Sequence, residues 1–166
     1  MMMSVRYIIV GLLGMLLYSC QGSPLLSGYS HVDREAWYRE DTAVISMNGE
    51  WMDENVSPNG GTLMVGVRYT DAYRYKKISL LVELQDEEAT IARDTVHFNL
   101  FDPNGHVVGR GLGYHDAMQP AIKLKALKGK GPYKVRITHL MRQNPVQGIT
   151  EVSCFSTSAQ HPSSEK

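Results

Sequence analysis

The sequence predicts an all-β protein built as a single antiparallel β-sandwich of the immunoglobulin-like kind. Three observations predict this class. Apolar residues recur with a period of two along most of the chain, turn-forming residues separate the alternating segments, and no segment after the first twenty residues has a helical period over three turns.

The strongest strand signals are segments in which apolar and polar side chains alternate strictly. One-sided alternation is typical of antiparallel strands that lie with one face on a core. Seven or eight short strands in a chain of this length favour a sandwich. The four strong strands are predicted at residues 62–69, 78–85, 95–101 and 133–142, and the weaker ones at 42–47, 107–112, 122–124 and 149–155.

Turn chemistry agrees with this strand assignment. Residues 102–105 read Asp-Pro-Asn-Gly, in which proline presets φ and the last two residues tolerate positive φ. They predict a hairpin between segments 95–101 and 107–112. Residues 86–88 read Asp-Glu-Glu and predict a solvated hairpin tip rather than an acid–base pair, because such a pair needs two different environments.

The N-terminus is predicted to carry a secretory signal. Arg6 precedes an apolar run at residues 7–18 that is too short to cross a bilayer comfortably and is followed by no stop-transfer charges. The run ends in Leu-Tyr-Ser before Cys20, which resembles a bacterial lipobox. This resemblance implies a diacylglyceryl group on Cys20 and cleavage just before it. The alternatives are an ordinary signal cleaved near Ser19 and an uncleaved anchor.

Four segments follow from these signals. Residues 1–19 are the predicted signal peptide, and residues 20–36 are the lipidated cysteine and a tether rich in Gly, Ser and Pro. Residues 37–155 form the predicted β-sandwich domain, and residues 156–166 form a flexible, polar tail.

Composition excludes several function classes. The formal net charge is +0, so the sequence predicts no nucleic-acid partner, which usually requires a basic surface. If Cys20 carries lipid, Cys154 has no disulfide partner and is expected to be a small buried hydrophobe. His139 falls in register with the core face of its strand, so it is either a core histidine or the mark of a bulge.

No constellation predicts catalysis, a cofactor or a metal. The six histidines show no HxH or HxxxH spacing, and zinc needs at least three converging ligands. The glycines at 109, 111 and 113 lie within a predicted β segment, where they favour a bulge over a nucleotide loop. No GxSxG nucleophile elbow occurs. We therefore predict that the protein is not an enzyme.

A tyrosine cluster is the one candidate interaction site. Tyr73, Arg74 and Tyr75 precede a strong predicted strand. Tyrosine and arginine are favoured where a protein surface meets a partner. They are also favoured at sandwich corners, where a phenol bonds to backbone, and packing is the stronger of the two interpretations.

Short motifs in a particular order carry a family resemblance. They are Cys20, Trp37, Val67-Arg68-Tyr69, Tyr73-Arg74-Tyr75, Asp94-Thr95, residues 102–105, the glycines of 109–113, Met141-Arg142 and residues 148–152. This order resembles the gliding motility lipoprotein family GldH of Bacteroidetes, over about residues 37–155.

The resemblance implies a non-enzymatic accessory or scaffold protein of the gliding and type IX secretion machinery. It implies attachment to the outer membrane through lipid, and partners among other envelope proteins. The residues after Cys20 are Gln-Gly-Ser-Pro, without the acidic residues of surface-exposed lipoproteins, which favours a domain facing the periplasm. The alternative is a glycan-binding lipoprotein that would use Trp37, Trp51 and the tyrosines against sugar rings.

Overall fold

The computed structural model describes residues 27–48, 61–109, 111, 113–124 and 132–158. Cys20, the predicted signal peptide at 1–19 and Trp51 lie outside the described residues. The predictions made for them therefore remain predictions.

Strands make up almost all of the described regular structure. The elements in chain order are β1 (Ser27–His31), the short 3-10 turn η1 (Asp33–Glu35), β2 (Ala36–Trp37), β3 (Ala43–Asn48), β4 (Gly61–Tyr69), β5 (Lys77–Gln85), β6 (Thr90–Asn99), β7 (His115–Leu124), β8 (Pro132–His139), β9 (Val146–Gln147) and β10 (Ile149–Ser158).

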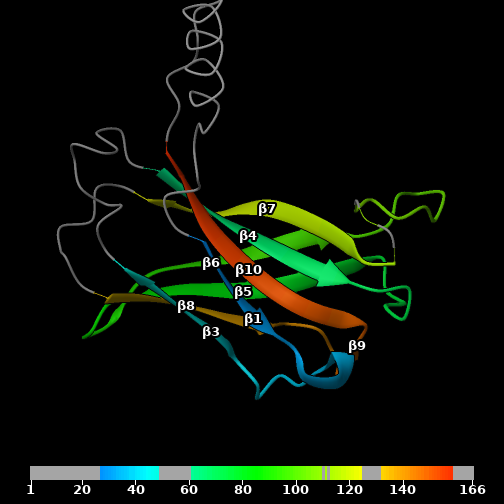
Figure 1. The fold of residues 1–166 in the computed structure, drawn as a ribbon, viewed down its shortest axis with the longest axis horizontal. Coiled ribbons are helices and arrows are strands. Elements are labelled where there is room, and N and C mark those ends of the chain that lie inside the picture. The colour runs from blue at the N-terminus through cyan, green and yellow to red at the C-terminus, as the bar shows by residue number, and fades with distance from the viewer. Residues whose placement is uncertain (1–26, 49–60, 110, 112, 125–131, 159–166) are drawn as a thin grey trace, which may run out of the picture.

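Two four-stranded antiparallel sheets form the body of the protein (Figure 1). One sheet has the strand order β1-β10-β4-β7, and the other has the order β3-β8-β5-β6. The sheets approach each other at both borders, where β1 contacts β3 and β6 contacts β7. A short pair, β2 with β9, lies beside them. The predicted all-β class and antiparallel sandwich are confirmed.

The core lies between the two sheets and follows from the alternation of the strands. In β5 the four residues Ile78, Leu80, Val82 and Leu84 are fully buried, and the intervening side chains are half-buried on the outer face. Strands β4 and β8 bury alternate residues in the same way. A period of two therefore directs one apolar face of each strand onto the other sheet.

Both predicted turns are confirmed. The β5–β6 hairpin turns at residues 86–89, where the Asp86 amide donates to the Ala89 carbonyl and the Asp86 carboxylate accepts from the Glu88 and Ala89 amides. These bonds lower the pKa of Asp86, the Ala89 amide most strongly. In the second turn, Gly105 has φ +86° and its amide donates to the Asp102 carbonyl.

The structure differs from the prediction at the borders of the domain. Ser27–His31, expected to be part of the tether, forms β1 and pairs with β10 from Phe155 to Glu151. At the other end β10 continues to Ser158, past the expected boundary at residue 155. Sheet pairing therefore includes residues on both sides of the predicted 37–155 domain.

The expected strand at 107–112 is also corrected. The described residues there form an isolated bridge, Phe101 to Val107, and the next strand begins at His115. Gly111 has φ +148° and Gly113 φ +81°, so the chain bends where a strand was expected. The short signal at 122–124 is the end of the ten-residue strand β7.

Candidate functional site

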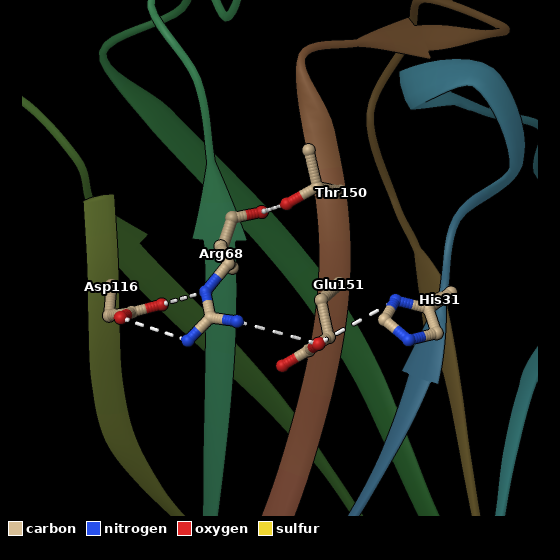
Figure 2. A network of polar contacts seen from close by, with 5 residues as sticks. All are labelled: His31, Arg68, Asp116, Thr150 and Glu151. Atoms are coloured by element: carbon tan, nitrogen blue, oxygen red, sulfur yellow. Dashed lines mark hydrogen bonds and ion pairs between the residues drawn. The ribbon is translucent and has the colours of Figure 1, made fainter. Parts of the chain in front are cut away.

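A row of charged side chains crosses the outer face of the β1-β10-β4-β7 sheet. Figure 2 shows His31 on β1, Glu151 on β10, Arg68 on β4 and Asp116 on β7 side by side. The register explains this arrangement, because His31 pairs with Glu151, Glu151 with Arg68, and Arg68 with Asp116. We call these four residues the charged row.

Arg68 is the centre of the charged row. Its guanidinium donates two hydrogen bonds to the Asp116 carboxylate, from Nε to Oδ1 at 2.8 Å and from Nη2 to Oδ2 at 3.2 Å. Two parallel bonds give a bidentate pair with fixed geometry. The Asp116 bonds, with the nearby carboxylate charges, raise the pKa of Arg68 against the opposing effect of burial.

Glu151 is the most shielded member of the row. Its side chain is only 15% exposed, and its Oε2 lies 3.6 Å from Arg68 Nη1 and 3.6 Å from His31 Nδ1. Both distances are longer than hydrogen bonds. Thr150, the neighbour of Glu151, donates its hydroxyl to the Arg68 carbonyl and ties β10 to β4 at this point.

A shallow hollow of about 390 Å³ lies over the charged row. Tyr114, which is 52% exposed, and Gly111 line it together with the row and Thr150. The hollow offers both hydrogen-bond donors and acceptors beside one aromatic ring. Sequence reasoning missed it, because Arg68 and Asp116 are 48 residues apart and meet only once the strand register is known.

The predicted tyrosine site is divided between core and surface. Tyr73 is 1% exposed and donates its hydroxyl to the Lys77 carbonyl at 2.7 Å, so the packing interpretation is confirmed. Burial, ahead of the neighbouring tyrosines, raises the pKa of Tyr73. Tyr75 is half-buried with its ring edge-on to Tyr73, and Arg74 is exposed. Of these three residues, only Arg74 and Tyr75 offer surface to a partner.

Tyr69 is a second buried phenol that links the two sheets. It lies on β4, and its hydroxyl donates to the Leu100 carbonyl at 3.0 Å beyond the end of β6. The same oxygen accepts from the Gly109 amide at 3.2 Å. Burial raises the pKa of Tyr69. These bonds give the tyrosine a structural role.

Trp37 and His139 form a buried aromatic pair. Trp37 is 1% exposed, and its indole nitrogen donates to the Asp41 carbonyl. It therefore presents no ring to a sugar, and the glycan hypothesis loses that residue. His139 is fully buried with its ring edge-on to Trp37 at 5.3 Å, which confirms a core position.

The His139 ring lacks hydrogen bonds within the described part of the chain. Neither ring nitrogen has a bond of normal geometry to a described residue. Burial lowers the pKa of His139, and repulsion from Arg39 acts in the same direction. The backbone of Trp37 and the charge of Glu40 oppose that shift.

Cys154 is a buried, free thiol, as predicted. Its sulfur lies 3.8 Å from the Met47 sulfur, and burial raises its pKa to about 12. A thiol in this state is neutral at physiological pH and is a poor nucleophile. Across the described residues, no three His, Cys, Asp or Glu side chains are arranged to hold a metal ion.

Comparison with known proteins identifies the family. A family model described as GldH lipoprotein matches residues 25–154, which includes the whole of both sheets except the last residues of β10. The chain belongs to the GldH lipoprotein family. Membership implies a membrane-associated lipoprotein of the gliding machinery. Within the described residues there is no helix with the length and apolarity to cross a membrane.

Two relatives carry the family name. The gliding motility lipoprotein GldH of Flavobacterium johnsoniae is 26% identical over 149 residues, covering 85% of this chain and 89% of the relative. A GldH homolog of Christiangramia forsetii is 31% identical over 94 residues, covering 54% of this chain and 57% of the relative. These names support a role in gliding motility.

One solved structure has a similar course of the chain. The Eiger TNF protein of S. frugiperda is 13% identical, with a TM-score of 0.32, and the match covers 87% of this chain and all of that one. At that score the likeness carries no structural or functional inference.

Proposed function

We propose that this GldH protein is attached to the outer membrane by lipid on Cys20, faces the periplasm, and acts as a non-enzymatic scaffold of the gliding and type IX secretion machinery. The family match over residues 25–154 is the observation that carries this proposal. The lipobox before Cys20 and the absence of acidic residues after it support the anchor and its orientation.

The described side chains support a scaffold over an enzyme. Arg68 and Asp116, which line the hollow, are paired with each other on an open sheet face. The Cys154 thiol and the His139 ring are buried in the core, where a substrate has no access. Such a domain offers partners its sheet faces and its loops, including the exposed Arg74 beside Tyr75.

The experiment that tests the anchor is mass spectrometry of the N-terminal peptide from the membrane fraction. A Cys20 that carries two or three acyl chains supports the proposal, and a Cys20→Ser variant released from the membrane is the matched control. Two long acyl chains give lasting attachment, since each buried methylene contributes about 0.8 kcal/mol. An unmodified N-terminus in the soluble fraction would refute the anchor.

The scaffold role is tested in a gliding relative from which its own copy of the gene is deleted. Complementation with this chain should restore colony spreading, and Arg74→Glu should weaken both spreading and co-purification of envelope proteins. Wild-type thermal stability of Arg74→Glu separates a lost contact from a lost fold. Full activity of the Cys20→Ser variant in this assay would contradict a membrane-attached scaffold.

A further inference from the structure

The two outer faces of the sandwich differ in character. On the β1-β10-β4-β7 sheet, five apolar residues point outward beside the charged row. Tyr29 is 63% exposed and Met118 is 53% exposed. We call this set the apolar sheet face: Tyr29, Met64, Met118, Pro120 and Phe155.

The outer face of the other sheet is mostly polar. Its β5 and β8 strands direct Ser79, Glu83, Lys134 and Arg136 outward. The apolar residues on this face include the exposed Val44 on β3 and the half-buried Leu81 on β5. An apolar set gathered on one face, with polar residues around it, marks an interaction surface. Scattered apolar residues on both faces would carry no such meaning.

The register arranges the apolar sheet face in rows across the four strands. From β1 to β7, one row reads Tyr29, Ser153, Gly66 and Met118. The next reads Ser27, Phe155, Met64 and Pro120. On the other side of the first row lies the charged row, which reads His31, Glu151, Arg68 and Asp116.

The charged row alternates in chemistry from strand to strand, and this makes it self-complementary. Consider two copies of this sheet face to face, related by a two-fold axis that runs parallel to the strands above the gap between β10 and β4. The second copy then presents the four residues of the charged row in reverse order. Glu151 then faces the partner's Arg68, and Asp116 faces the partner's His31. Each carboxylate meets a basic group, whereas an unreversed row would place like groups opposite each other.

The apolar rows are also compatible with this reversal. Tyr29 faces the partner's Met118, and Phe155 faces the partner's Met64. At the centre Ser153 faces the partner's Gly66, where the lack of a side chain lets the two faces approach. Apolar groups are thus opposite apolar groups in the interior of the contact, with the charged row at one border.

We propose that a second copy of this chain covers the apolar sheet face, in a symmetric dimer whose axis runs parallel to the strands. An isologous two-fold contact of this kind is the commonest route to a closed oligomer. The area of the contact follows from the dimensions of the sheet. Four strands about 4.8 Å apart give its width, and the nine residues of β4 at about 3.4 Å per residue give its length, so each copy contributes a face of about 600 Å². The total of about 1,200 Å² is at the lower limit of specific interfaces.

The direction of the axis agrees with the position of the N-terminus. An axis parallel to the strands leaves the two copies of Ser27 at the same end of the dimer. Both tethers then leave toward one membrane, whereas an axis across the strands would direct them to opposite ends. This step rests on the proposed anchor, as does the treatment of Cys20 as an unreactive thiol in the cross-link below, and the face-to-face contact is argued without it.

The first test is native mass spectrometry of the full chain, purified in mild detergent, over a concentration series. We expect a reversible dimer, and we expect Met118→Lys to weaken it at least tenfold, because each dimer then buries two lysines. Val44→Lys is the matched control on the other sheet, since Val44 is 43% exposed, and it should leave the dimer intact. A chain that stays monomeric, or a dimer that Met118→Lys leaves unchanged, overturns the proposal.

A cross-link tests the axis itself. Thr157 is exposed near the end of β10, on the same face as Phe155. Sheets about 10 Å apart and a displacement of one strand put its two Cα atoms about 11 Å apart in the dimer. Thr157→Cys should be linked by a short bis-maleimide in isolated membranes, and Ser46→Cys on the polar face should not.

The two cysteines already present in the chain are not expected to react with the bis-maleimide. Cys154 is buried, and Cys20 is the proposed site of lipid. Links at Ser46→Cys, or none at Thr157→Cys, overturn the proposed dimer. Dimerisation in detergent is measured whether or not Cys20 carries lipid, so failure of the dimer and failure of the proposed anchor are distinguishable.

Discussion

Two glycines with nearly the same backbone conformation should differ sharply in their tolerance of a methyl group. Gly148 has φ +83° and Gly105 has φ +86°, so alanine is strained at both positions. A Cβ on Gly105 would have no heavy atom within 4 Å. A Cβ on Gly148 would lie 2.3 Å from the Tyr73 nitrogen and 2.7 Å from the Ala72 carbonyl carbon.

The contacts at Gly148 have no easy relief. The atoms it would meet belong to the backbone, so no side-chain rotation can make room. Gly148 is also held from both sides, because its amide donates to the Glu35 carbonyl at 2.8 Å and its carbonyl accepts from the Thr70 amide at 2.8 Å. For an ordinary contact of 3.4 Å or more, the backbone at residue 148 and the backbone at residues 72–73 must separate by about 1 Å.

The magnitude follows from the difference between the two sites. Left-handed backbone costs alanine about 1–2 kcal/mol at either glycine, and the reduced freedom of the unfolded chain offsets about 0.4–1 kcal/mol at both. Gly148→Ala adds overpacking of about 1–3 kcal/mol and weakens two hydrogen bonds of about 1 kcal/mol each. We expect Gly148→Ala to reduce the free energy of unfolding by about 3–5 kcal/mol more than Gly105→Ala.

Urea unfolding followed by far-UV circular dichroism measures this difference directly. Equal slopes of the transitions for both variants would show that the comparison concerns the same two states. A difference below about 1 kcal/mol between Gly148→Ala and Gly105→Ala would refute the close approach of residue 148 to the Tyr73 backbone.

Three further predictions concern buried polar groups. The pKa of His139 in the folded state is lowered from 6.5, so the unfolded state binds a proton first as the pH falls below about 6.5. The protein should therefore lose stability as the pH falls below about 6.5. A plot of the urea midpoint against pH should be flatter in that range for His139→Leu than for the wild type. Tyr73→Phe removes the bond to the Lys77 carbonyl and should lower the free energy of unfolding by about 1 kcal/mol, measured in urea. The Cys154 thiol, buried with a pKa of about 12, should resist maleimide until the chain unfolds, as the mass of the labelled protein will show.

The strands that sequence reasoning found are those whose inner faces are large and apolar. β5 is the clearest, since its four inner residues are aliphatic and fully buried. β1 was missed because it crosses close to β3, and a Cβ on Gly28 would lie 2.3 Å from Ile45 Cγ2. A close crossing requires small residues on the inner face, and small residues leave no period of two to detect.

The first half of β7 was missed for a different reason. The pairing of β4 with β7 shifts between Leu63 and Met64, so that Ala121 is an extra residue opposite β4. Both Ala121 and Ile122 are consequently buried, and the strict alternation is broken. Pro120, exposed on this edge strand, further obscured the signal, although an edge strand tolerates proline.

The charged row was beyond sequence reasoning because it depends on strand order, which periodicity leaves open.

The composition of the outer faces is different in this respect. Alternation shows which side chains of a strand point outward, even when the neighbouring strands are unknown. Polar residues are expected at the outward positions of a sheet that faces water. The outward positions of β8 agree with this, since they hold Lys134 and Arg136. Met64 and Phe155 on β4 and β10 depart from it. A local departure from an otherwise consistent pattern is where a functional constraint is expected. The apolar sheet face gathers several such departures on one side of the sandwich, and the proposed contact with a second chain accounts for them.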